Sequence, residues 1–113
     1  MKIFAAVLSL YFVTQAFASG SSSCHFHGKA EAAEAAVLEC ATKKKDSLIE
    51  SKKIEVSWKE IKHEKIEKVT MKSGKMEWKL TFKNPQTKEA SKSSLYMFFS
   101  LPGNFLASNF TGE

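Results

Sequence analysis

The chain has 113 residues, 26% of them charged, and a formal net charge of +5 at pH 7. This length fits one small domain. Its 17 strongly basic residues are all lysines. Arginine is the residue best suited to bidentate contacts with phosphate and guanine, so we do not expect a specific nucleic-acid reader.

Residues 1–18 have the three parts of a secretory signal peptide. Lys2 gives a positive start, residues 3–13 an apolar core, and residues 16–18 a small-x-small cleavage site. A membrane anchor needs about 20 consecutive apolar residues, and this run is shorter. We therefore expect a secreted, extracellular protein without a transmembrane segment. Residues 19–27 are predicted to be a flexible segment, and residues 28–113 a single small domain.

Cys24 and Cys40 are the two cysteines of the chain. In an oxidising compartment two cysteines most simply form one disulfide. It would stabilise the domain by about 3 kcal/mol, by restricting the unfolded chain.

The stretch from Gly28 to Ser51 predicts a helix, because alanine, glutamate and leucine dominate its first half. Lysines 43–45 are expected near its C-terminal end, where they complement the helix dipole. Asp46 and Ser47 are expected to interrupt it. The residues predicted to face the core are Ala33, Val37, Cys40 and Ala41.

Residues 52–68 fit two structures. Ile54, Val56 and Trp58 alternate with polar residues, as in a strand, although Ile54, Trp58 and Ile61 are also helix-spaced. We favour a strand with a bulge near Glu60.

Residues 69–83 predict the β-hairpin on which the domain is organised. Apolar and polar residues alternate on both sides of Gly74, which can adopt the positive φ of a tight turn. Trp78 should lie at the centre of the core, and replacing it should cost more stability than replacing Trp58. The predicted inner face consists of Val69, Met71, Met76, Trp78, Leu80 and Phe82.

Residues 94–101 are apolar on both faces, which predicts a central strand, and residues 105–110 predict a last short strand. Helix first and strands after it indicate an α+β fold with one N-terminal helix on a three- to five-stranded antiparallel sheet. Cystatin-like and ribonuclease-like arrangements share this order, although the cystatin inhibitory motif is absent from the hairpin. The predicted core residues are Trp78, Leu80, Phe82, Met97 and Phe99.

Two histidine-containing segments are candidates for chemistry. His25 and His27 would point to the same side of an extended segment, as metal ligands can, but Cys24 beside them is expected in the disulfide. His63 and Glu64 would face opposite sides of a strand, so they cannot act together on one substrate. We predict no catalytic residue, cofactor or metal.

Asn109 begins an N-glycosylation sequon, Asn-Phe-Thr. Lysines and glutamates are interleaved through residues 50–67, unlike a phosphate-binding face, so only weak attraction to anionic surfaces is expected.

The combination of signal peptide, small size, one disulfide and no catalytic motif resembles the small effector-type proteins that pathogenic fungi and other parasites secrete. This resemblance implies a non-enzymatic, virulence-associated protein that binds a host or extracellular partner. An alternative is a carrier of an apolar ligand, with a pocket formed by Trp78, Phe82, Phe98 and Phe99. A third is a degenerate ribonuclease-like domain, which needs His63 in a cleft beside a second acid or base.

Overall fold

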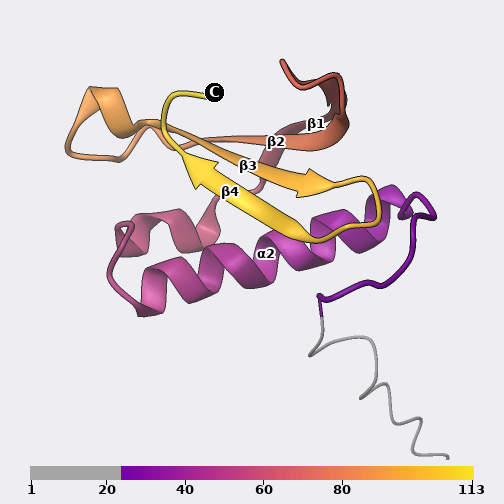
Figure 1. Ribbon diagram of the computed structural model, residues 1–113. Helices are drawn as coiled ribbons and strands as arrows, with labels where there is room; N and C mark the ends of the chain where they lie inside the picture. The colour runs from indigo at the N-terminus through magenta and orange to yellow at the C-terminus, as the bar shows by residue number, and fades with distance from the viewer. Residues whose placement is uncertain (1–23) are drawn as a thin grey trace, which may run out of the picture.

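One helix packs against one face of a four-stranded antiparallel sheet of order β1-β2-β3-β4 (Figure 1). The computed structural model describes residues 24–113, so the predicted signal peptide lies outside the described residues. This arrangement confirms the α+β prediction. The elements in chain order are the helix α2 (Glu34–Glu50), the short 3-10 helix η1 (Val56–Glu60), strands β1 (His63–Thr70) and β2 (Met76–Lys83), the short 3-10 helix η2 (Ala90–Lys92), and strands β3 (Ser94–Ser100) and β4 (Phe105–Asn109).

Helix α2 starts later than the sequence predicted and is not interrupted before its end. Ala33 is its N-cap in an extended conformation, because the N–H of the preceding Ala32 is tied to the carbonyl of Leu101. The helix continues through Asp46 and ends at Glu50, so the expected interruption is wrong and no basic residue lies in its last turn. Packing overrides the weak helix propensities of Asp46 and Ser47. The buried residues of α2 are Val37, Cys40, Ala41 and Lys45.

The predicted hairpin, formed by β1 and β2, is present with Gly74 in its turn, but the prediction that Val69 and Trp78 share its inner face is wrong. Gly74 has a φ of 86°, and Lys68 pairs with Trp78 while Val69 pairs with Glu77. Directly paired residues share a face of the sheet, so Val69 lies on the opposite face from Trp78. Thr70 pairs with Met76 across a turn that has an odd number of residues, and this puts Val69 opposite Glu77 and not opposite Trp78. The buried residues of β2 are Trp78, Leu80, Thr81 and Phe82.

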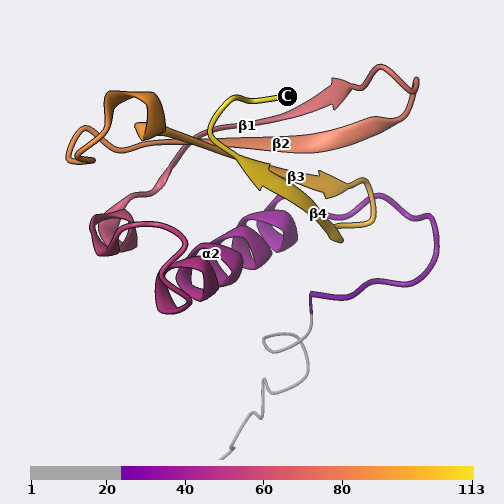
Figure 2. The ribbon, with the colours of Figure 1, turned by 60° about the vertical axis from the view of Figure 1, so that its left-hand side comes forward.

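Strand β3 is central and covered on both faces. Its helix-facing residues lie opposite those of β2, with Phe99 paired to Trp78 and Met97 to Leu80. On the other face, Lys79 lies over the ring of Tyr96 at 5.0 Å. The C-terminal tail also reaches this face (Figure 2), where a Cβ at Gly112 would come within 3.3 Å of the Tyr96 ring. All five residues predicted for the core, Trp78, Leu80, Phe82, Met97 and Phe99, are buried.

The strand predicted over residues 52–68 is wrong in its first part, whereas the part from His63 onward belongs to β1. Val56–Glu60 forms the 3-10 helix η1, in which Val56 is 74% exposed and Trp58 only 1% exposed. A 3-10 turn puts these two side chains in different directions, whereas strand alternation would have put them on one face. The irregularity predicted near Glu60 lies further on, as a register shift between His63 and Lys65.

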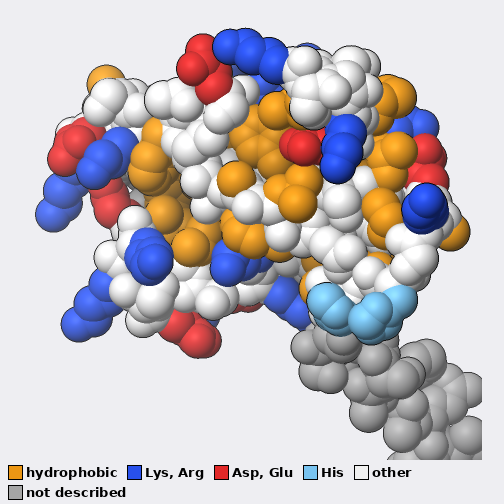
Figure 3. Space-filling view, viewed as in Figure 1, with side chains coloured by type: hydrophobic (Ala, Val, Ile, Leu, Met, Phe, Trp, Pro, Cys, Tyr) orange, Lys and Arg blue, Asp and Glu red, His pale blue; other side chains and the backbone are white. Residues whose placement is uncertain are grey.

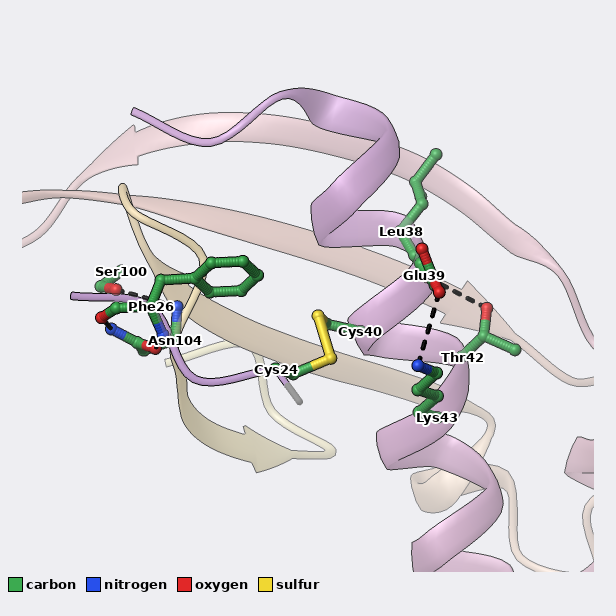
Figure 4. Close-up of a disulfide and its surroundings, with 9 residues drawn as sticks. All are labelled: Cys24, Phe26, Leu38, Glu39, Cys40, Thr42, Lys43, Ser100 and Asn104. Atoms are coloured by element: carbon green, nitrogen blue, oxygen red, sulfur yellow. Dashed lines mark hydrogen bonds and ion pairs between the residues drawn. A yellow bond between two sulfur atoms is a disulfide. The ribbon is translucent and has the colours of Figure 1, made fainter. Parts of the chain in front are cut away.

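The N-terminal segment is fastened to the domain by a covalent bond and by hydrogen bonds (Figure 4). The predicted disulfide is confirmed, since Cys24 is bonded to Cys40 of α2 with a Cα–Cα distance of 5.6 Å. Phe26 donates its N–H to Asn104 Oδ1 at 2.6 Å and accepts a hydrogen bond from Asn104 Nδ2 at 2.9 Å. Residues 24–27, which we assigned to a flexible segment, are therefore attached to the β3–β4 turn.

Candidate functional site

The first part of the candidate site is a hollow of about 560 Å³ between the end of α2, the η1 segment and the η2 segment. It opens on the left of Figure 3, where hydrophobic side chains lie between two projecting parts of the molecule. Its floor consists of Ile49, Ile54, Val56, Trp58 and Phe110. Its rim carries Lys52, Lys53 and Lys92.

A second hollow, of about 410 Å³, continues from the first along β4. Lys53, Ile54 and Phe110 line both hollows, so the two are lobes of one groove. We call it the lysine-rimmed groove. The second lobe adds apolar surface from Leu48, Leu95 and Phe105, and a further rim lysine, Lys44. Lys44 Nζ lies 4.4 Å from the centre of the Phe105 ring.

The chain reversal after α2 builds one wall of the groove. Lys52 has a φ of 61°, in the left-handed region that glycine usually occupies after a helix. Lys53 and Ile54 both donate their N–H groups to the carbonyl of Leu48, which folds Ile54 back against the end of α2. A lysine in place of glycine costs some backbone strain but sets a cation at the rim.

Buried Asn84 connects the two loops that face each other across the first lobe. Its side chain donates from Nδ2 to Ser57 Oγ at 2.9 Å and accepts from the N–H of Gln86 at 2.9 Å. Glu55 makes a second link, because its Oε2 accepts the N–H of Lys88 at 3.1 Å. These bonds hold the η1 segment against the η2 segment, so the lobe is formed without a ligand.

The floor and the rim differ in what they offer a ligand. Trp58 and Phe110 pack with their ring centroids 6.5 Å apart, and Val56 stands exposed beside them. The two acidic residues of the lining are already engaged, Glu55 with Lys88 and Glu89 with Lys92 at 3.7 Å. Between residues 24 and 113, no ion pair involves Lys52 or Lys53.

A smaller hollow of about 380 Å³ lies on the other side of η1. His63 and Glu60 both line it, whereas Glu64 does not and instead pairs with Lys83 at 3.5 Å. The structure thus keeps His63 and Glu64 apart, as the alternation in the sequence predicts. The other polar residues of this lining are Thr42, Lys45, Lys59 and Lys62.

Lys45 is the buried cation of this smaller hollow. Its ammonium group donates to the carbonyls of Lys59 and Ile61, which fastens η1 to the middle of α2. Burial lowers the pKa of Lys45 below its ordinary value, and the carboxylates of Asp46 and Glu60 oppose this shift. The sequence analysis expected Lys45 only as one of three lysines near the helix C-terminus, so its burial was missed.

The other candidates from the sequence lie apart from the groove or at its margin. His25 and His27 pack edge to face with ring centroids 4.7 Å apart, and the described part of the chain holds no group of three or more His, Cys, Asp or Glu suited to a metal ion. Asn109 lines the second lobe. Its Oδ1 accepts hydrogen bonds from Thr111 and Gly112 in an Asx turn.

Comparison with known proteins yields one family. The profile of the Family of unknown function (DUF6488) matches residues 1–113. No curated protein and no solved structure matches the chain. No helix of residues 24–113 is long and apolar enough to cross a membrane.

Proposed function

The chain belongs to this family of unknown function, and we propose from its own residues that it is a secreted, non-enzymatic protein that binds an extracellular or host protein. The observation that carries this proposal is the lysine-rimmed groove, where exposed Val56 and the Trp58–Phe110 pair lie beside several cations. Apolar surface surrounded by polar residues is typical of protein-binding faces.

Two further observations support the proposal. The Cys24–Cys40 disulfide suits an oxidising compartment, in agreement with the predicted signal peptide. The second is the filled interior: Trp78, Phe82 and Phe99 are buried between the sheet and α2, and Phe98 is buried on the other face. The carrier alternative requires a pocket formed by these four residues. Because they are buried, their arrangement does not support that alternative.

Affinity capture tests the proposal. Immobilised mature protein is incubated with extracellular fluid of the producing system or its host, and captured proteins are eluted with excess free protein. We expect at least one protein whose capture is saturable and is competed by the free chain. Capture that never saturates, or that survives this competition, would reject an interaction role.

The ribonuclease-like alternative keeps one specific observation in its favour. Because His63 and Glu60 line the same hollow, a histidine and a second acid do share a cleft. Such a pair can perform acid–base chemistry on RNA. An RNA-cleavage assay decides between the two functions. We expect no turnover, and cleavage that disappears in both His63→Ala and Glu60→Gln would establish the enzyme instead.

A further inference from the structure

The two lobes of the lysine-rimmed groove form one continuous surface with a defined middle. Ile54 and Phe110 line both lobes and so mark the boundary between them, and Lys53 stands at the same boundary. A ligand that fills both lobes must therefore cross Lys53. The lobes, of about 560 and 410 Å³, are each as large as pockets for small molecules, so each has room for an apolar side chain.

The floor of each lobe selects apolar groups. Val56, Trp58 and Ile49 contribute to the first lobe, and Leu48 and Phe105 to the second. Val56 is 74% exposed, so most of its apolar side chain faces water. Covering it would remove apolar surface from water, which favours binding.

The rim of the groove selects acidic groups. Lys44, Lys52 and Lys53 surround the two lobes and form no ion pair within residues 24–113, whereas Lys92 is paired with Glu89 and Glu55 accepts the backbone N–H of Lys88. A second copy of this chain would bring the same lysines toward one another, which like-charge repulsion opposes. Charge complementarity therefore favours a different, acidic partner.

The groove is preorganised, which reduces the entropy lost on binding. The Asn84–Ser57 and Glu55–Lys88 hydrogen bonds fix the walls of the first lobe, and the left-handed Lys52 fixes the end of α2. A partner segment can therefore bind without ordering these loops. The first lobe is also open to the surface (Figure 3), as suits a chain segment better than an enclosed small molecule.

The geometry points to an acidic peptide segment of the partner protein, with two apolar side chains, as the occupant of the groove. One apolar side chain enters each lobe, and a carboxylate between them meets Lys53. This inference rests on the proposed function and adds the chemistry of the partner. It assigns binding to the face made by α2, η1, η2 and β4.

The experiment measures binding of a fluorescein-labelled peptide by anisotropy. The probe is a run of aspartates and glutamates with two leucines separated by three acidic residues, so that in an extended segment both leucines and the middle carboxylate face the same side. Two matched peptides replace either both leucines by serine or every acidic residue by lysine. The protein variants are Val56→Asp and Lys53→Glu in the groove. Their controls are Met76→Asp and Lys72→Glu, at exposed positions near the far hairpin turn.

We expect the acidic leucine peptide to bind saturably and more weakly as salt rises. Each groove variant should weaken binding by about tenfold or more, as for other central contacts of an interface, while the controls bind like the wild type. The serine peptide should lose most of the affinity.

Several results would overturn the inference. They are equal affinity of groove and control variants, equal affinity of the serine and leucine peptides, or binding only to vesicles of anionic lipid. Concentration-dependent dimerisation that Val56→Asp abolishes would assign the groove to a second copy. The proposed function fails separately. If a captured partner binds the groove variants as tightly as the wild type, the interaction role stands and only the assignment to this groove is wrong.

Discussion

The two ends of α2 are held against the sheet in different ways. At the N-terminal end, which we call the closed end, the Cys24–Cys40 bond and the reciprocal hydrogen bonds between Phe26 and Asn104 fasten residues 24–27 to the β3–β4 turn. The carbonyl of Leu101 adds two acceptor contacts there, to the indole N–H of Trp78 and the N–H of Ala32.

At the C-terminal end, the open end, no disulfide is present among the described residues and apolar surface is exposed at Val56. Trp58 and Phe110 pack under exposed Val56, and the loops are joined by hydrogen bonds through Asn84 and Glu55. A small domain has few kcal/mol of net stability to distribute. The comparison teaches that a covalent bond restrains the first half of α2, whereas the second half is held by hydrogen bonds and by the packing of buried Trp58.

The largest expected change in the free energy of unfolding comes from replacing either tryptophan. Comparing the two variants tests whether the open end contributes to the core as much as the closed end does. Trp58 is 1% exposed and Trp78 is 5% exposed. Trp58→Ala and Trp78→Ala should each lower the free energy of unfolding by about 3–5 kcal/mol, because each leaves a large cavity. Denaturant unfolding of both variants measures this. A Trp58→Ala midpoint close to that of the wild type would show that the open end is only a peripheral layer.

This expectation differs from the one drawn from the sequence, which ranked Trp78 above Trp58. Strict alternation in β2 located Trp78 and its neighbours Leu80 and Phe82 correctly, since a strand that is half buried has a period of two. The same rule failed at Val56 and Trp58. Three alternating residues also occur in a 3-10 turn, and local pattern cannot distinguish the two.

The next effect concerns the covalent restraint of the closed end. Replacing both cysteines, in Cys24→Ser with Cys40→Ser, should lower the free energy of unfolding by about 3 kcal/mol, since the bond spans a sequence separation of 16 residues. Hydrogen exchange should then accelerate at residues 24–32 and stay slow at residues 54–60. Equal acceleration at both ends would mean that the two ends of α2 are not independent.

A smaller effect depends on pH and concerns Lys45, which joins η1 to α2. Lys45→Met leaves the carbonyls of Lys59 and Ile61 without this donor, which should cost about 1–2 kcal/mol. The pKa of Lys45 is lowered by burial, so between that pKa and 10.5 the unfolded chain binds more protons than the folded one. The stability contributed by Lys45 therefore rises with pH in this window.

The difference in unfolding free energy between the wild type and Lys45→Met should accordingly grow from neutral toward alkaline pH. Lys62→Met, at an exposed position of the same hollow, is the matched control and should show no such growth. Urea titrations at several pH values measure both. A constant difference across the range would contradict the lowered pKa.

The groove itself could not be predicted from the sequence, for a physical reason. Its floor comes from four separate segments, represented by Ile49, Val56, Leu95 and Phe110, whose meeting depends on the chain reversal at Lys52. A left-handed lysine has no sequence signal, because glycine or asparagine is expected there. The disulfide, the α+β order and the burial of Trp78, Leu80, Phe82, Met97 and Phe99 follow from local pattern and were predicted, whereas the exposure of Met76 and the burial of Thr81 were not.

The smallest expected effect on stability separates binding from folding at the open end. Val56 is 74% exposed, so Val56→Ser removes little apolar surface that the folded chain has buried and should change the free energy of unfolding by less than about 0.5 kcal/mol. Met76→Ser, at a residue that is 44% exposed on β2, is the matched control. Both variants should unfold at the wild-type midpoint in urea, while only Val56→Ser weakens binding of the acidic leucine peptide. A clear loss of stability in Val56→Ser would show that this valine supports η1, and would remove the main reason to regard the open end as a binding face.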